Sequence, residues 1–190
     1  MKAFLSICLI LLTVQSWAQT PPGKEIQIKM AVLAAPEDQR ANATVYAFDG
    51  TLLRKGSNQT VCLGDDPSRE GLSVSCYHIS AQPFMERGWA LRKDGKNAQQ
   101  VFDIREAEAK SGKLKLPDSG SLLNALVADE KDINWTTGEV KNSYTRSVIY
   151  IPWATAESTG LPLKPAGPGL PWIMDPGTHR AHIMINPARD

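Results

Sequence analysis

The fold is decided by residues 59–79, which read QTVCLGDDPSREGLSVSCYHI. Two strand-like runs, 59–63 and 72–79, flank a segment dense in turn formers, a pattern that predicts a β-hairpin. If the hairpin is centred on Arg69, Cys62 and Cys76 are equally distant from the centre and lie opposite each other. Directly opposed strand residues are within the span of a disulfide. We therefore expect a Cys62–Cys76 bridge, with two buried free thiols as the alternative.

The first 18 residues have the pattern of a signal peptide. Lys2 gives a positive start, residues 3–14 form an apolar run, and Ser16-Trp17-Ala18 places small residues where a signal peptidase reads them. The run is shorter than the roughly 20 apolar residues that span a bilayer. We expect cleavage after Ala18 and a mature protein in the periplasm or outside the cell, where disulfides persist.

Composition and charge exclude several classes of protein. Of the 190 residues, 42% are hydrophobic and 22% charged, which is typical of globular proteins. Residues 19–190 are therefore expected to form a single domain. Lys plus Arg is 21 and Asp plus Glu is 20, and the leader contributes only Lys2, so the mature chain is neutral. Neutrality predicts no nucleic-acid partner, and the lack of a second long apolar run predicts no membrane span in the mature chain.

The order of strand and helix patterns predicts an α+β fold. Helices are expected from Pro83 to Gly95, capped by Ser80, and from Asn97 to Gly112, with Asn97 and Gln100 as a capping box. Residues 24–34 fit either a strand or a short helix. Strands are expected at 44–48, 51–54, 122–127, 144–153, 172–174 and 181–185, and in 132–140 with a turn at Thr137-Gly138. This order predicts an antiparallel sheet, made of an N-terminal meander and C-terminal strands, packed against a helical hairpin.

The candidate pocket consists of His78, Asp175, His179 and His182. Residues 179–182 have HxxH spacing, but on a strand these two histidines point to opposite faces, which disfavours local metal chelation. The four side chains can therefore meet only through tertiary contacts. Serine-hydrolase and phosphate-loop motifs are absent from the sequence, so no catalytic residue, metal or cofactor is assigned.

These observations favour a non-catalytic protein, either ligand-binding or associated with the envelope. The expected partner is a small ligand or an envelope protein. The alternative is a hydrolase or metal-dependent enzyme that uses His78, His179 and His182. The acidic pairs Asp65-Asp66 and Glu106/Glu108 are assigned to a turn and to a solvated helix surface. The sequons at Asn42, Asn58 and Asn134 are meaningful only in a eukaryotic secretory pathway, and the host stays open.

The segment 160–172 is rich in glycine and proline. Its prolines 162, 165, 168 and 171 recur at the three-residue period of polyproline II. We expect Pro162, Pro165, Pro168 and Pro171 to form a surface strap over Trp153 and Trp172. The alternative is a docking peptide for an aromatic groove.

Several short motifs together resemble a group of uncharacterised secreted bacterial proteins with paired cysteines. The matching residues include Lys55-Gly56-Ser57-Asn58 before Cys62 and a C-terminal motif of Gly177-Thr178 and Ala181-His182-Ile183-Met184. The likeness covers most of the mature chain and is weakest in the helical middle and the Pro-Gly segment. It implies a bacterial source and a periplasmic address, and it implies no activity.

Overall fold

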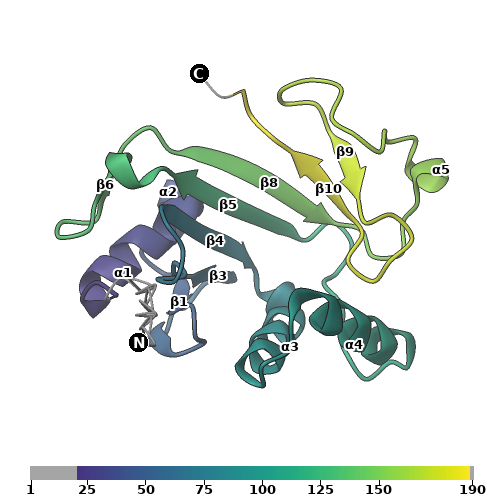
Figure 1. The fold of residues 1–190 in the computed structure, drawn as a ribbon, viewed down its shortest axis with the longest axis horizontal. Helices are drawn as coiled ribbons and strands as arrows, with labels where there is room; N and C mark the ends of the chain where they lie inside the picture. The colour runs from purple at the N-terminus through teal and green to yellow at the C-terminus, as the bar shows by residue number, and fades with distance from the viewer. Residues whose placement is uncertain (1–20, 189–190) are drawn as a thin grey trace, which may run out of the picture.

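The computed structural model describes residues 21–188 and is built around an eight-stranded sheet (Figure 1). The strand order is β2-β1-β3-β4-β5-β8-β10-β9, antiparallel throughout except between β1 and β3. The strands are β1 (Thr44–Tyr46), β2 (Leu52–Arg54), β3 (Thr60–Leu63), β4 (Leu72–His78), β5 (Leu122–Ala128), β8 (Tyr144–Tyr150), β9 (Trp172–Met174) and β10 (His182–Ile185). The predicted α+β class is confirmed. The expected signal peptide, residues 1–18, lies outside the described residues.

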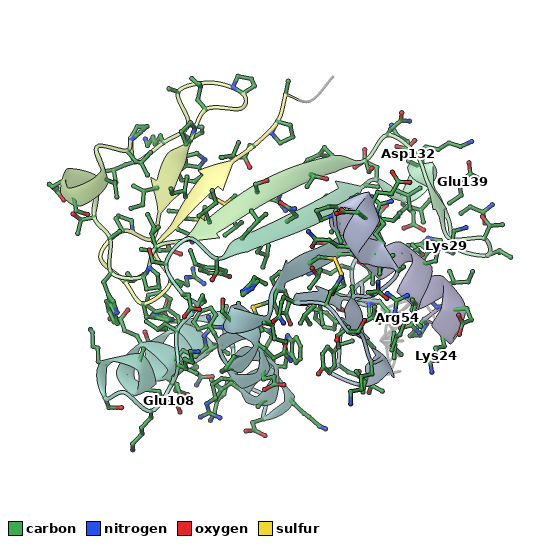
Figure 2. The ribbon with its side chains drawn as sticks, turned by 180° about the vertical axis from the view of Figure 1, so that it is seen from behind. Lys24, Lys29, Arg54, Glu108, Asp132 and Glu139 are labelled. Carbon is green, nitrogen blue, oxygen red and sulfur yellow. A yellow bond between two sulfur atoms is a disulfide. The ribbon has the colours of Figure 1, made fainter. Side chains whose placement is uncertain are left out.

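Helices cover the two faces of the sheet at different ends. On one face lie α1 (Lys24–Ala31), the 3₁₀ turn η1 (Val32–Ala34) and α2 (Glu37–Arg40). On the other lies the hairpin of α3 (Gln82–Lys93) and α4 (Ala98–Lys110). Figure 2 shows this separation, with Glu108 of α4 far from Lys24 and Lys29 of α1. Residues 24–34 are thus helical, which decides between the two structures that their pattern allowed.

Each helical group covers its own hydrophobic core. Alternate strand residues such as Val74, Cys76 and Leu126 pack with α1 and η1, and we call this side of the sheet the α1 face. The intervening residues, such as Tyr77 and Leu123, pack with Phe84 and Trp89 of α3, on the α3–α4 face. The hairpin strands therefore have both faces buried, because each face has a helical cover of its own.

The cysteine hairpin is confirmed. Cys62 of β3 is the direct register partner of Cys76 of β4, and a disulfide joins them. Both cysteines are buried on the α1 face, and the bridge is the yellow bond in Figure 2.

The N-terminal strands differ from a simple meander. β1 and β2 form the expected hairpin, but β3 then pairs with β1 in parallel, on the side away from β2. The chain between β2 and β3 passes close to the start of β1. Gly56 makes this approach possible, because a Cβ at this position would overlap the backbone oxygen of Asn42. Its backbone N–H also donates to Thr44 Oγ1 at 3.1 Å. The chain therefore passes directly over the start of β1.

The helical hairpin follows its sequence signals with one correction. Asn97 and Gln100 form the predicted capping box of α4. Ser80 does not cap α3, contrary to expectation; it lies in the 3₁₀ turn η2 (Ile79–Ala81), and its Oγ is 2.6 Å from Ser121 Oγ. Because η2 occupies the residues directly before α3, the Ser80 hydroxyl points towards Ser121 and does not reach the N–H groups of the first turn of α3.

Two further strand predictions need correction. The run 144–153 stops pairing at Tyr150, because Trp153 has a positive φ of 68° and its N–H donates to Thr178 O at 2.8 Å. The segment 132–140 has the turn expected at Thr137-Gly138, but it does not join the main sheet. It contributes the end of η3 (Glu130–Asp132) and a separate hairpin of β6 (Ile133–Asn134) and β7 (Glu139–Val140). The last helix is α5 (Ala156–Thr159). Within residues 21–188, no helix is long and apolar enough to cross a membrane.

Candidate functional site

The three histidines do not come together. His182 pairs with Tyr150 across β10 and β8, so it lies on the α3–α4 face. His78 follows Tyr77 on β4 and lies on the α1 face, where it lines a shallow groove with Leu122 and Asn124. The sheet therefore separates His78 from the other two histidines.

His179 and His182 are close in sequence, but their side chains bind different groups. His179 is fully buried, and its Nδ1 lies 3.2 Å from Glu106 Oε2 of α4. Burial lowers the pKa of His179, with the Glu106 carboxylate opposing that shift. His182 holds its Nδ1 2.7 Å from the carbonyl oxygen of Arg180, and burial lowers its pKa as well. Both rings are therefore neutral at pH 7, with Nδ1–H donating to these oxygens.

Asp175 belongs to the same turn. It has a positive φ of 53°, and its Oδ2 is 2.7 Å from Arg180 Nε. Arg180 also lies over the ring of Phe102 of α4, 4.9 Å from its centroid. The turn is thus fixed to α4 by one histidine and one arginine. Across the described part of the chain, no three His, Cys, Asp or Glu side chains are grouped so that they could hold a metal ion.

Arg105 is the group at this end of the sheet that sequence reasoning missed. It projects from α4 into the core and is only 8% exposed, and its guanidinium carbon lies 3.3 Å from the centroid of the Phe84 ring. Its Nε is buried and has no hydrogen-bond partner among the described residues. Burial lowers the pKa of Arg105 to about 10; the nearby Tyr150 hydroxyl opposes this shift, whereas Arg180 and Arg92 add to it.

Gly88 of α3 packs directly against this guanidinium. A Cβ built on Gly88 would lie 2.7 Å from Arg105 Nη1 and 3.7 Å from both terminal nitrogens of Arg92. The two guanidinium groups therefore approach the same point on α3. Arg92 is exposed to solvent, whereas Gly88 and Arg105 are buried, and the Arg105 guanidinium occupies the space that a side chain at position 88 would take.

Three more buried donors lie on the α3–α4 face without an acceptor among residues 21–188. They are Trp89 Nε1, Arg146 Nε and Trp172 Nε1. Trp89 belongs to the core of that face, and the register places Trp172 opposite Met184 and Val148 on the same side. Arg146 is two residues from Val148 and shares its face. Indole and guanidinium N–H groups can only donate. Two buried acceptors, His179 Nε2 and Asn186 Oδ1, also have no partner among the described residues.

The Pro-Gly segment is held to the sheet at two points. Pro162 O accepts from Ile173 N at 3.0 Å on β9, and Asn186 O accepts from Gly169 N at 2.6 Å after β10. Its prolines Pro162, Pro165, Pro168 and Pro171 are exposed. Trp153 remains 38% exposed and lies near Lys110 Nζ of α4, whereas Trp172 is half-buried. The strap and docking alternatives for this segment stay predictions.

Comparisons with protein-family models, with curated proteins and with solved structures found no match. The resemblance to secreted bacterial proteins therefore stays a prediction.

Proposed function

We propose that this chain is a secreted, non-catalytic binding protein whose small ligand contacts the α3–α4 face of the sheet. The observation that carries the proposal is the set of buried donors without acceptors on that face: Trp89, Arg105, Arg146 and Trp172. Buried polar groups in folded proteins nearly always have partners, and leaving one unpaired costs about 1–3 kcal/mol. Trp89 packs against Tyr46 of β1 and Trp172 lies on β9, at opposite ends of the strand order, so a small ligand reaches only part of the set. Its acceptor oxygens would satisfy the donors within reach.

Secretion is supported by two independent features. The Cys62–Cys76 disulfide is of a kind that persists outside the reducing cytosol. The first 18 residues have the charge, apolar run and small-residue pattern of a signal peptide.

Binding is better supported than catalysis because the histidines are used structurally. His179 is fully buried and paired with Glu106, and His182 donates to a backbone carbonyl in its own turn. An enzyme that uses all three histidines would need His78 on the α3–α4 face, but His78 lies on the α1 face. Because the sheet separates His78 from His179 and His182, ligand binding is favoured over the hydrolase or metal-dependent alternative.

Thermal shift measurements against organic acids, sugar phosphates and neutral sugars test the proposal. We expect at least one compound to raise the melting temperature at millimolar concentration. Trp172→Phe keeps an aromatic ring, although a smaller one than indole, and removes one donor, so it should weaken that compound's affinity roughly threefold to tenfold. His78→Ala is the matched control on the opposite face and should leave affinity unchanged. One equivalent of zinc that survives dialysis, or ester hydrolysis that His182→Ala abolishes, would overturn the proposal in favour of an enzyme.

A further inference from the structure

A cavity of about 420 Å³ lies between the turn that joins β1 to β2 and the C-terminal half of α3. Its walls come from residues 48–51 of the turn and from three residues of the helix, Trp89, Arg92 and Lys93. The cavity is open to solvent, and its volume is within the range of small-molecule sites. It lies near the β2 edge of the sheet, at the opposite end of the strand order from Trp172 of β9.

Contacts within the chain hold the walls of this cavity in place. The backbone N–H of Thr51 donates to Asp49 Oδ1 at 2.9 Å and closes the turn. Gly50 has a positive φ of 86°, and a Cβ there would lie 3.3 Å from Trp89 Cε3, so glycine lets the turn pack against the indole. Trp89 also packs against Tyr46 of β1, with ring centroids 5.4 Å apart. The cavity is therefore formed without a ligand.

The lining of the cavity combines aromatic rings with two cations. Phe48 is half-buried and Trp89 is 9% exposed, and together they provide the apolar part of the lining. Arg92 and Lys93 are exposed to solvent, and neither forms an ion pair among residues 21–188. A ligand that enters from solvent therefore meets both kinds of group.

The carboxylates near the cavity leave it with an excess of positive charge. Asp49 is the carboxylate in the lining; its backbone hydrogen bond holds its pKa below the usual value, and the charge of Lys93 acts in the same direction. The charge of Asp66 also acts on Arg92, but Asp66 has its own ion pair with Arg69 at 3.7 Å. Two cations against one carboxylate in the lining favour an anionic ligand.

We propose that this cavity binds a second small ligand, an aromatic carboxylate, with its ring against Phe48 and Trp89 and its carboxylate towards Arg92 and Lys93. Aromatic rings pair in offset or edge-on arrangements, which gives the ring a defined place. Hydrogen bonds between ionised partners are about twice as strong as neutral ones, which gives the carboxylate its place. This site goes beyond the proposed function and does not rest on it, because Trp172, through which that function is tested, lies at the other end of the sheet.

NMR of the tryptophan indole N–H signals gives a local readout, because only four tryptophans follow residue 18. Spectra of Trp89→Phe and Trp172→Phe identify the signals of these two residues. The probes are benzoate, its neutral amide benzamide, and acetate, which lacks the ring. We expect benzoate at millimolar concentration to shift the Trp89 signal saturably and to leave the Trp172 signal unchanged. Benzamide should bind about tenfold more weakly than benzoate, and acetate should leave the Trp89 signal unchanged.

A pair of double variants tests the two cations. Arg92→Gln/Lys93→Gln should weaken benzoate binding roughly tenfold. Lys96→Gln/Lys113→Gln is the matched control, because it removes the same charge from exposed lysines outside the cavity, and it should leave affinity unchanged. Cations in the last turn of a helix also stabilise that helix. A purely structural role of Arg92 and Lys93 would therefore lower the melting temperature of the first variant and leave its affinity for benzoate intact.

Three results would overturn the proposal. They are a Trp89 signal that benzoate does not shift in wild type, equal affinities for benzoate and benzamide, and equal losses of affinity in the two double variants. The melting temperature of each variant without ligand shows whether it is folded. The thermal shift screen for the proposed function is a separate measurement with its own variant, Trp172→Phe, so either proposal can fail while the other stands.

Discussion

Breaking the Cys62–Cys76 disulfide should lower stability by an amount set mainly by the loop that it closes. The two cysteines are 14 residues apart, and a loop of this length corresponds to about 3 kcal/mol of lost chain entropy in the unfolded state. For a protein of this size, 1 kcal/mol shifts the melting temperature by about 2–4 °C, so we expect a loss of about 6–12 °C. Both side chains are buried between strands β3 and β4 and the helical cover of α1 and η1, so a cavity would add to the loss if the sulfur atoms were removed.

Reduction separates these two contributions because it breaks the bond and keeps both sulfur atoms. The assay compares thermal unfolding of oxidised wild type, reduced wild type and Cys62→Ala/Cys76→Ala. Intact mass confirms reduction by the gain of two hydrogen atoms. The reduced protein should melt below the oxidised one. The double variant should melt at the lowest temperature, and reductant should not change that temperature. A reduced protein that melts within about 2 °C of the oxidised form would refute the loop-entropy reasoning.

Three further perturbations have defined outcomes. Gly56→Ala should destabilise by about 3 kcal/mol in urea unfolding, because its Cβ would overlap the backbone of Asn42; a loss under about 1 kcal/mol contradicts this. Burial raises the pKa of Asp65 to about 6, and the charges of Asp66 and Glu130 add to this shift. Protonation of Asp65 therefore stabilises the folded wild type at low pH, and this stabilisation is lost as the pH rises through 6. Asp65→Asn should therefore be more stable than wild type at pH 8 by about 1–2 kcal/mol after allowance for solvent exposure, and an equal gain at pH 4 contradicts this. Pro165→Ser/Pro168→Ser should lower the melting temperature modestly and increase acrylamide quenching of tryptophan; an unchanged melt with loss of an envelope partner favours the docking peptide.

Local signals in the sequence were sufficient to predict the elements whose partners lie close together in the chain. The hairpin from residue 59 to 79 follows from two strand runs around a turn, and its register places Cys62 opposite Cys76. The capping box of Asn97 and Gln100 forms for the same reason, since both partners lie within one turn of helix. These predictions need no knowledge of the rest of the fold.

Predictions that depend on partners distant in sequence were incomplete. Trp153 looked like the end of a strand, but its backbone turns back to bond Thr178, which no local pattern reveals. β3 skips β2 and joins β1 because Gly56 permits a close crossing over the chain. The separation of His78 from His182 follows from alternation along two strands whose pairing the sequence did not specify.

Arg105 was missed because a charged residue in an amphipathic helix is ordinarily assigned to the solvent side. The apolar residues Val101, Ile104 and Ala107 recur at helical spacing in the sequence, but in the structure Ala107 is exposed whereas Arg105 is buried. The guanidinium over the Phe84 ring takes the place that an apolar residue would fill. A buried charge at a position that the helix pattern assigns to solvent is therefore a signal that only the structure provides.

The two faces of the sheet differ in chemistry, and this difference assigns them separate roles. The core of the α1 face is mainly aliphatic and carries the disulfide. The α3–α4 face carries aromatic rings, a buried arginine and N–H groups without acceptors, which is a poor way to maximise stability. Protein folds tolerate such conflicts mainly where a functional contact compensates them. Breaking the Cys62–Cys76 disulfide should therefore lower stability. Replacing Arg105 by methionine should leave stability unchanged or raise it, because a buried charge without an ion pair is removed.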